Sequence, residues 1–392
     1  MWLVPALRFP EFSGEWNTSS IEEQFELYSG NTPSRMDKKQ FDGTVNWITS
    51  GELKEHYIAD TKEKISDEAV KSNNLKLLPV GTFVIAIYGL EADGVRGTCS
   101  ITASESTISQ ACMAFISKKD IANEFLYAWY KKHGNVIGIR YAQGTKQQNL
   151  SYDIIEKFNI SYPCIEEQKK LIRFISLIDE RIATQNKIIE KLETLIKGIC
   201  NKSLYTVNGT AIQLGDILIE RRERTVINNQ YEVLSSTVKG IFSQREYFSK
   251  DIASENNVGY KIIRLHDVVL SPQNLWMGNV NYNDNFEVGI VSPSYKVFSI
   301  AENLDKRYIA TLLKTHRALY NYMLVSEQGA SIVRRNLNME AFEQITFKIP
   351  PLSKQEKIGN AISILQARIT SAIRIKTAYE AQKQWLLTQM FI

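Results

Sequence analysis

The chain contains one long internal repeat, and this duplication restricts its possible folds more than any other feature. A gapless alignment at an offset of 187 matches Asn149-Leu150 with Asn336-Leu337, Pro163 with Pro350, Gln168 with Gln355, Lys170 with Lys357, Ile175-Ser176 with Ile362-Ser363, and Arg181-Ile182 with Arg368-Ile369. Upstream, at an offset smaller by two, residues 77–84 resemble residues 262–269, and Gln143-Gly144 matches Gln328-Gly329. A period of this length indicates two whole domains rather than a solenoid of small repeats.

The most regular part of each copy follows its proline and has the heptad pattern of a coiled coil. In the first copy, apolar positions step alternately by four and three residues, interrupted only by Gln185, at Leu171, Ile175, Ile178, Ile182, Ile189, Leu192, Ile196 and Ile199. The equivalent positions of the second copy are Ile358, Ile362, Leu365, Ile369, Ala372, Lys376, Tyr379, Lys383 and Leu386. Pro163 and Pro350-Pro351 favour helix entry, where a missing N–H group costs no hydrogen bond.

A helix from about residue 165 to 200 has a length of about 54 Å at about 1.5 Å per residue. An amphipathic helix of this length has to bury its apolar stripe, and the second copy offers a partner of equal length with a matching stripe. Antiparallel pairing would place the globular domains at opposite ends of a rod, around an approximate twofold axis. The alternative is that each helix packs separately on its own globular domain.

Both globular segments combine short strand patterns with helical stretches. Strands are expected at residues 82–88 and 267–271, and helices at 121–133 and 304–324. We therefore expect an α+β fold in which two globular α/β domains are separated by two long helices that form an antiparallel coiled coil. The expected boundaries are residues 1–162 and 204–349 for the globular domains, 163–203 for the central helix and 350–392 for the C-terminal helix.

The net charge of +4 becomes informative only when it is divided by region. Lys and Arg number 17 against 20 Asp and Glu in residues 1–162, 7 against 6 in 163–200, 17 against 15 in 201–350, and 6 against 2 in 351–392. The excess therefore lies mostly in the last helix. A surface that contacts phosphate would have to arise from local clusters of Lys and Arg.

Five loops rich in Lys, Arg, Gln and Asn carry side chains that can contact DNA. Arg can bind guanine with two hydrogen bonds, Gln or Asn can bind adenine, and Lys mostly contacts phosphate. The candidate DNA-binding residues are Lys38, Lys39, Lys146, Gln147, Gln148, Arg221, Arg222, Arg224, Gln273, Asn274, Arg334 and Arg335. Each cluster also fits an ordinary solvated surface. Trp47 is expected to lie in the core rather than to stack on a base.

The sequence offers no motif for catalysis or metal binding. The Asn/Asp-Pro-Pro-Tyr/Phe motif of adenine methyltransferases is absent, because Pro350-Pro351 is followed by Leu352, and no glycine-rich cofactor loop is found. The four histidines, His56, His133, His266 and His316, lack metal-ligand spacing. The four cysteines, which we expect to be packing residues, are Cys99, Cys112, Cys164 and Cys200. We expect neither a catalytic residue nor a bound metal in this chain.

The ends of the chain carry two further expectations. The first residues lack the basic start and apolar run of a signal peptide, and no stretch approaches 18 apolar residues, so we expect a cytoplasmic protein without membrane contact. The apolar residues Trp385-Leu386-Leu387 and Met390-Phe391-Ile392 are expected to pack within the chain.

These residues together resemble the specificity subunits of type I restriction-modification systems over essentially the whole chain. The resemblance is carried by residues 4–12, Gly14-Glu15-Trp16, and the helix runs 166–172, 177–182 and 185–192. The second copy keeps Pro350-Pro351-Leu352 and residues 355–358, but has Ala367 where the first copy has Glu180.

The resemblance implies a DNA-recognition subunit without chemistry of its own. Residues 1–162 and 204–349 would be target-recognition domains that each bind one half of a split, asymmetric sequence in double-stranded DNA, and the paired helices would set the length of the spacer. Two methyltransferase subunits would dock around the helices, with restriction and motor subunits completing the complex. S-adenosylmethionine, ATP and Mg²⁺ would be bound by those partners, and none by this chain.

Two other classes of function are compatible with parts of the pattern. An enzyme is disfavoured by the missing motifs. The net charge is compatible with a coiled-coil scaffold that binds proteins but not DNA. Salt-dependent association with DNA, which a scaffold should lack, distinguishes the scaffold from a recognition subunit.

Overall fold

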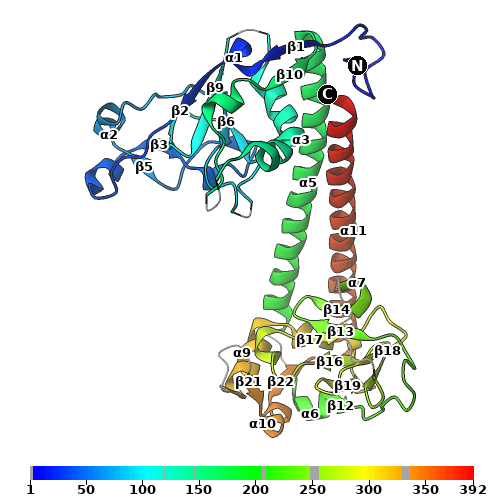
Figure 1. The fold of residues 1–392 in the computed structure, drawn as a ribbon. Coiled ribbons are helices and arrows are strands. Elements are labelled where there is room, and N and C mark those ends of the chain that lie inside the picture. Colours follow the sequence, from blue (N-terminus) through cyan, green and yellow to red (C-terminus); the bar gives the residue numbers. More distant parts are fainter. Residues whose placement is uncertain are drawn as a thin grey trace. The chain divides into compact units, whose positions relative to one another are not determined.

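The structure, a computed structural model, describes residues 3–92, 94–118, 120–144, 147–204, 209–247, 256–328 and 335–392. The chain forms two compact units: unit 1 is Met1–Gln185 with Arg374–Ile392, and unit 2 is Asn186–Ile373. Each unit therefore contains one globular domain and one half of each long helix, α5 (Ile165–Leu204) and α11 (Leu352–Met390) (Figure 1). This grouping differs from the predicted four-part division, which separated the helices from the globular domains.

Unit 1 is built around a five-stranded sheet of order β2-β9-β6-β7-β4, accompanied by a smaller sheet of order β5-β3-β8 and the antiparallel pair β1-β10. The strands are β1 (Asn17–Ser20), β2 (Phe25–Ser29), β3 (Val45–Ile48), β4 (Tyr57–Ile58), β5 (Lys64–Ile65), β6 (Phe83–Ala86), β7 (Cys99–Thr102), β8 (Ser106–Ile108), β9 (Cys112–Ser117) and β10 (Asn159–Tyr162). The helices besides α5 are α1 (Ile21–Gln24), α2 (Asp67–Ser72), α3 (Asn123–Tyr141) and α4 (Tyr152–Ile155), with 3-10 turns η1 (Lys38–Phe41) and η2 (Ser50–Glu52).

Unit 2 contains a four-stranded sheet of order β12-β19-β16-β17 and the pairs β11-β22, β13-β14, β15-β18 and β20-β21. Its strands are β11 (Thr210–Gln213), β12 (Leu218–Glu220), β13 (Leu234–Thr237), β14 (Gly240–Ser243), β15 (Lys261–Arg264), β16 (Val268–Leu270), β17 (Val280–Tyr282), β18 (Val288–Val291), β19 (Lys296–Ile300), β20 (Ser326–Gln328), β21 (Arg335–Leu337) and β22 (Thr346–Ile349). Its short helices are α6 (Leu214–Ile217), α7 (Gln244–Tyr247), α8 (Lys306–Leu313), α9 (His316–Leu324), α10 (Met339–Glu343) and the 3-10 turn η3 (Leu275–Met277).

The two units share one topology, which explains the repeat in the sequence. The order β2-β9-β6-β7 of unit 1 corresponds to β12-β19-β16-β17 of unit 2, and β1-β10 corresponds to β11-β22. Strands β6 and β16 begin at Phe83 and Val268, which match each other in the upstream alignment of the two copies. The predicted α+β fold, with a duplicated globular domain and two long helices, is confirmed.

One predicted helix is divided in the structure. Residues 304–324 form α8 and α9 rather than a single helix, because Thr315 begins a new helix by accepting a hydrogen bond from the backbone N–H of Ala318. The corresponding element of unit 1, α3, is continuous and extends to Tyr141, beyond the predicted end at residue 133.

Within each unit, the halves of α5 and α11 contribute to one hydrophobic core. In unit 1, Leu171 and Ile175 of α5 share a core with Leu386 and Met390 of α11. In unit 2, Ile196 of α5 packs against the core that contains Ile358 and Ile362 of α11. The half-helices that meet come from opposite ends of the two helices, as antiparallel pairing requires.

The predicted stripe of both helices is protected from solvent. Leu171, Ile175, Ile178, Ile358, Ile362, Ala372 and Leu386 are buried, and Ile182, Ile189, Leu192, Ile196, Ile199, Leu365, Ile369 and Tyr379 are partly buried. Side chains between these positions are mostly exposed. Interlocking of the stripe as a regular coiled coil stays a prediction.

Two repeated glutamines attach the long helices to the globular domains. Gln168 is fully buried, donates to the carbonyl oxygens of Pro163 and Asp120, and accepts from the N–H of Ala122. In unit 2, Gln355 donates to the carbonyl oxygen of Pro350 and accepts from the N–H of Asp305. Because buried backbone groups need partners, these amides explain why both positions of the repeat carry glutamine.

The described part of the N-terminal segment and the C-terminal residues of α11 both pack within unit 1. Arg8 forms two hydrogen bonds, of 2.8 and 2.7 Å, to Glu167, whose side chain is 1% exposed. At the other end, Leu386, Leu387, Met390 and Phe391 are buried, as predicted, whereas Trp385 is 55% exposed. The packing prediction for the cysteines is correct for Cys99 and Cys112, and Cys200 is partly buried, but Cys164 is exposed beside the start of α5.

Candidate nucleic-acid interface

A hairpin loop in unit 1 carries two of the predicted DNA-binding residues, Gln147 and Gln148. Its base is closed by the backbone hydrogen bonds that Gln143 and Asn149 exchange, of 2.8 and 2.9 Å. Gly144 makes the turn with a positive φ of 116°, and a Cβ there would overlap the carbonyl oxygen of Gln147. Lys146, the third predicted residue of this loop, lies outside the described residues.

The hairpin forms one wall of an open cavity of about 540 Å³. Tyr88 and Tyr152, which also line it, are 36% and 43% exposed. Gln147 is exposed, and its side-chain amide has no hydrogen-bond partner among the described residues. The amide of Gln148 instead accepts from Arg96 at 2.8 Å. The cavity therefore combines a free amide with aromatic rings, the groups that bind base edges and stack on bases.

Unit 2 has a hairpin, β20-β21, at the equivalent position of the repeat. The backbone N–H of Arg335 donates to the carbonyl oxygen of Gln273 at 3.1 Å. The structure thus brings together three predicted residues, Gln273, Asn274 and Arg335, from two loops that are well separated in the chain. Arg334 lies outside the described residues.

An aromatic residue that the sequence analysis did not select completes this group. Trp276 lies in η3, and the Arg335 guanidinium stands over its ring, 4.5 Å from the centroid. The Nε atom of Arg335 is buried without a hydrogen-bond partner among the described residues. The position of Trp276 two residues after an amide pair in a loop was the available signal. Packing on an aromatic ring restricts a guanidinium and prepares it for directional binding.

The matching loops of the two units are attached in the same way. In unit 1, Leu90 donates its backbone N–H to the carbonyl oxygen of Gln148, and Leu150 donates to that of Ile87, at 2.9 and 2.8 Å. The loop after β6 therefore contacts the hairpin of unit 1, as the loop after β16 contacts that of unit 2. The duplication has produced two equivalent loop pairs that carry amide, guanidinium and aromatic groups.

The cluster Arg221-Arg222-Glu223-Arg224 serves partly to hold the fold of unit 2. Arg221 donates from Nε to Asp267 at 2.7 Å, and Arg224 donates to the carbonyl oxygen of Gly259 at 2.9 Å. Burial raises the pKa of Asp267, although hydrogen bonds from the backbone of Arg264 and from Arg221 oppose this. The side chain of Arg222 is 89% exposed, so Arg222 is the member of this cluster that is most accessible to a ligand.

The predicted pair Lys38-Lys39 lies in a separate part of unit 1. Both side chains are exposed on η1, which packs near a small hydrophobic core that contains Trp47. Trp47 is 1% exposed, in agreement with its predicted core position. Arg35 covers its ring at 5.5 Å from the centroid and pairs with Glu63. The lysines are available for phosphate contacts, but the structure does not join them to the hairpin.

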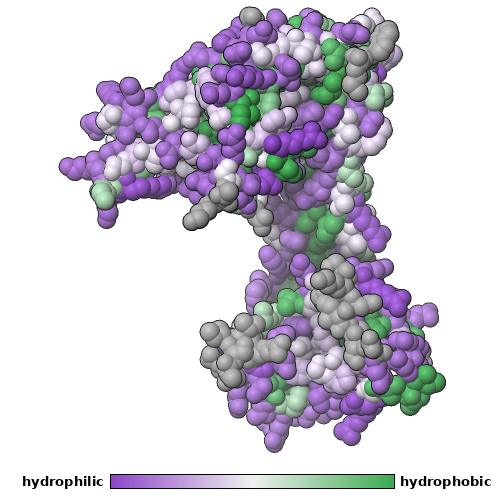
Figure 2. All heavy atoms as spheres, viewed as in Figure 1, coloured by the Kyte–Doolittle hydropathy of each residue, from purple (hydrophilic) through white to green (hydrophobic). Residues whose placement is uncertain are grey.

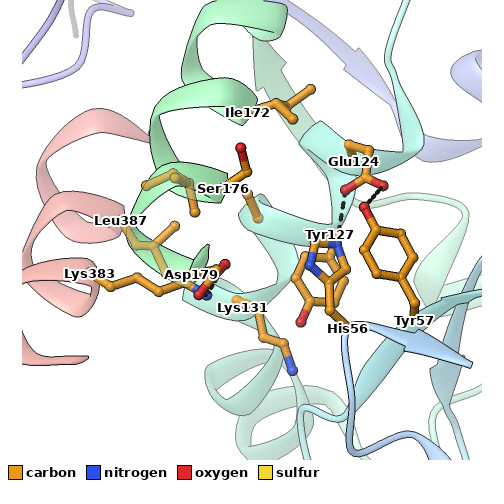
Figure 3. A pocket seen from close by; sticks show the side chains of 12 residues that line it. His56, Tyr57, Glu124, Tyr127, Lys131, Ile172, Ser176, Asp179, Lys383 and Leu387 are labelled. Atoms are coloured by element: carbon orange, nitrogen blue, oxygen red, sulfur yellow. Dashed lines mark hydrogen bonds and ion pairs between the residues drawn. The ribbon is translucent and has the colours of Figure 1, made fainter. Parts of the chain in front are cut away.

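Each unit also has a groove between its long-helix segment and the helix that follows its main sheet. In unit 1 the groove is lined by α3, α5, α11 and the segment around His56 (Figure 3). Glu124 accepts hydrogen bonds from His56 at 2.9 Å and Tyr57 at 2.8 Å, and His56 is stacked between Tyr57 and Tyr127. Figure 3 also shows Lys383 directed toward Asp179, with which it pairs at 2.7 Å.

The hydrogen bonds in this groove change the acidity of its side chains. Burial alone would raise the pKa of Glu124, but the hydrogen bonds from His56 and Tyr57 outweigh it and lower that pKa. Burial and the bond to Glu124 raise the pKa of Tyr57 to about 12. The acidic groups of the unit 1 groove therefore already have partners within the chain.

The remaining surface shows no other chemical centre in the part of the chain described. Figure 2 shows polar residues over most of the visible face of each unit, with apolar residues in small groups (Figure 2). Among the described residues, no group of three or more His, Cys, Asp or Glu side chains could hold a metal ion. None of the helices within the described ranges is long and apolar enough to span a bilayer.

The duplicated fold, with matched hairpins and a pair of long helices, defines a class of two-domain proteins built from a repeated α+β module. The sequence matches the family described as the type I restriction modification DNA specificity domain over residues 13–194 and 212–378. The chain therefore belongs to this family, as the resemblance in the sequence indicated.

Curated relatives match parts of the chain. The type I restriction enzyme MjaIX specificity subunit of Methanocaldococcus jannaschii is 28% identical over 185 residues, which are 45% of this chain and 42% of the relative. The EcoR124I/EcoR124II specificity subunit of Escherichia coli is 27% identical over 177 residues, which are 44% of this chain and 43% of the relative. These matches span less than half the length of each relative.

Solved structures share the fold over nearly the whole chain. The type I restriction-modification system S subunit from M. genitalium has a TM-score of 0.62, 14% identity and 99% coverage of both chains. A chain from a structure of complex assembly and conformational transition of the type I R-M system has a TM-score of 0.55 and 11% identity, with 96% and 97% coverage. At these identities the likeness concerns the fold alone.

Proposed function

We propose that this chain is the sequence-specific DNA-recognition subunit of a type I restriction-modification complex. Each unit would bind one half of a bipartite, asymmetric target in double-stranded DNA. The observation that carries the proposal is the pair of equivalent loop clusters, one in each unit, that hold amide, guanidinium and aromatic groups at the same place in the fold. Two copies of one loop arrangement with different side chains suit a target whose halves differ in sequence.

The side chains that differ between the two clusters are consistent with each unit binding a different half of the target. Unit 1 offers Gln147 with Tyr88 and Tyr152, whereas unit 2 offers Arg335 on Trp276 beside Gln273. An amide suits adenine and a guanidinium suits guanine, so the halves of the target would differ in composition. Lys38, Lys39 and Arg222, which are exposed, would add contacts to phosphate.

Equivalent apolar residues on the outside of the long helices support two identical partner subunits. Leu177 and Ile364, which are equivalent positions of the repeat, are 40% and 57% exposed. Ile188 and Ile375, which are also equivalent, are 39% and 42% exposed. Exposed apolar side chains at repeated positions suit two copies of the same protein. The partners would be two methyltransferase subunits, which would bind S-adenosylmethionine, with ATP and Mg²⁺ used by restriction subunits.

The test is co-expression of the chain with its methyltransferase subunit, followed by mapping of methylated adenines in host DNA by single-molecule sequencing. The expected result is a split motif that disappears when this chain is deleted. A methyltransferase that keeps its motif without the chain would contradict the proposal and favour the scaffold alternative. Falling affinity with rising salt in a binding assay would give independent support.

A further inference from the structure

A groove in unit 2 has the lining of an anion-binding site. Its volume is about 480 Å³, and it lies between α8, α11, the β13-β14 turn and the segment that follows β17. Its charged or titratable lining residues are Lys239, His266, Tyr282, Asp284, Arg307 and Lys314. Three of them are cations at neutral pH, and one is an acid.

This groove is the repeat counterpart of the groove in Figure 3. Residues Ile172, Ser176 and Asp179 of α5 line the unit 1 groove, and their equivalents in the gapless alignment, Gly359, Ser363 and Gln366 of α11, line that of unit 2. Opposite these residues, Glu124 and Lys131 of α3 correspond in the same order and spacing to Arg307 of α8 and to Lys314, the residue that follows α8. The two grooves therefore occupy one position in the duplicated fold.

The grooves differ in charge and in size. Unit 1 has two acids, Glu124 and Asp179, which are satisfied by His56, Tyr57 and Lys383. In unit 2 those two positions carry Arg307 and Gln366, so both acids are replaced. The volume of the groove is about 50 Å³ in unit 1 and about 480 Å³ in unit 2. The unit 1 groove therefore has little free volume and acids that are already paired, whereas the unit 2 groove is larger and has an excess of positive charge.

The cations of the unit 2 groove are available to a ligand. The ammonium group of Lys239, an exposed residue of the β13-β14 turn, has no partner among the described residues. Arg307 is exposed and donates one of its guanidinium N–H groups to Asn360. Lys314 donates to the side-chain oxygen of Asn281 at 2.6 Å, and burial lowers its pKa. The free donors are therefore those of Lys239 and the remaining groups of Arg307 and Lys314.

We propose that the unit 2 groove binds the phosphodiester backbone of DNA and that the equivalent groove of unit 1 does not. This inference rests on the proposed function, which supplies DNA as the ligand. Amide and cationic side chains are the groups that bond to phosphate oxygens, and such contacts position the protein without recognising sequence. The two units would then bind DNA unequally: one through its hairpin loops, the other through its hairpin loops and this groove.

The experiment uses the complex of this chain with its methyltransferase subunits and a duplex that carries the methylated motif. Dissociation constants are measured from low to high salt for the wild type, Lys239→Gln and Arg307→Gln. Each substitution should weaken binding at low salt and reduce the slope of log K against log salt by about 1, because each removes about one phosphate contact. The methylated motif should stay unchanged.

Lys131→Gln, which removes a cation that lines the unit 1 groove at the position equivalent to Lys314, is the control and should leave the slope unchanged. Lys239→Gln changes an exposed side chain in a turn, so it preserves the fold even where Arg307→Gln disturbs it. An unchanged slope for Lys239→Gln and Arg307→Gln would overturn the groove proposal, as would loss of methyltransferase subunits at constant slope. If the wild-type complex bound DNA without sequence preference, the proposed function would be contradicted. The salt dependence of its binding, compared with that of the variants, would still show whether the groove contacts phosphate.

Discussion

Lys383 of α11 donates to both carboxylate oxygens of Asp179 of α5, with Nζ 2.7 and 2.8 Å from them. Lys383 occupies a predicted core position of the heptad pattern, and its side chain is only 17% exposed. A charged residue at such a position lowers stability unless it is paired, and in return it specifies the register of two helices. The ion pair therefore explains how unit 1 accommodates a lysine in an otherwise apolar stripe.

Asp179→Asn should destabilise unit 1 by about 1 to 3 kcal/mol, because it leaves a partly buried lysine without its counter-charge. The double variant Asp179→Leu with Lys383→Leu should recover most of that loss, since neither charge then remains. Urea unfolding measures both. Glu380→Gln, which removes an exposed pair with Lys376 on the same helix, is the control and should change stability by less than about 0.5 kcal/mol. Equal losses in the single and double variants would show that the charge pair is unimportant.

The pKa of Glu124 predicts a pH-dependent contribution to stability. Its folded-state pKa lies below the ordinary value of 4.5, so the stabilisation is present above pH 4.5 and is lost as the pH falls through the lowered value. Glu124→Gln should therefore cost about 1 to 2 kcal/mol at neutral pH and progressively less in acid. Unfolding curves at several pH values test this. Glu26→Gln, which affects an exposed pair with Lys76, should show no comparable trend, and a cost for Glu124→Gln that is constant with pH would refute the interpretation.

Arg335 should determine sequence preference in one half of the target. Arg335→Ala removes the guanidinium that lies over Trp276 and should reduce discrimination at one base by about 1 to 3 kcal/mol. Mapping of methylated sites should show one relaxed position in the half bound by unit 2 and no change in the other half. Arg368→Ala, an exposed cation of α11, is the matched control. Relaxation in both halves, or in neither, would exclude this role.

The apolar residues outside the helices should control the number of methyltransferase subunits. Leu177→Asp with Ile375→Asp alters unit 1, and Ile188→Asp with Ile364→Asp alters unit 2. Each double variant should lose one of two bound subunits, because charge in a docking surface carries a desolvation penalty. Native mass spectrometry measures the composition. Ile139→Asp, at an exposed residue of α3, should retain both subunits; full occupancy in all variants would place the docking surface elsewhere.

Helix length should set the length of the unrecognised spacer. Insertion of one heptad into both α5 and α11 adds about 10 Å to each helix at about 1.5 Å per residue. With about 3.4 Å per base pair, the spacer should increase by about three base pairs while both half-sites stay the same. Methylation mapping reports the new motif. Replacement of an existing heptad by another of equal length is the control and should leave the spacer length unchanged. An unaltered spacer after the insertion would show that helix length does not set the spacer length.

The repeat and the heptad stripes were accessible from the sequence because both depend on local periodicity. A helix buries one face about every 3.6 residues, so Leu171, Ile175 and Ile178 mark the buried face without knowledge of any partner. Duplicated copies keep the same backbone requirements, and Gln168 and Gln355 recur because each satisfies the same buried carbonyl and N–H groups. The α+β class followed from these patterns, and the family followed from the resemblance of particular residues to those of type I specificity subunits.

Only the tertiary structure decided which polar side chains are free. Arg221 and Arg222 are neighbours in sequence, yet Arg221 is bonded to the buried Asp267, whereas Arg222 is 89% exposed and approaches Glu220 only at 4.0 Å. The contact between Arg335 and Trp276 and the contrast between the two grooves likewise depend on segments that are far apart in the chain. A sequence pattern indicates which face of a helix or strand is buried. The partner of a charged group depends on packing between segments that are distant in sequence, and such packing produces no periodic pattern in the sequence.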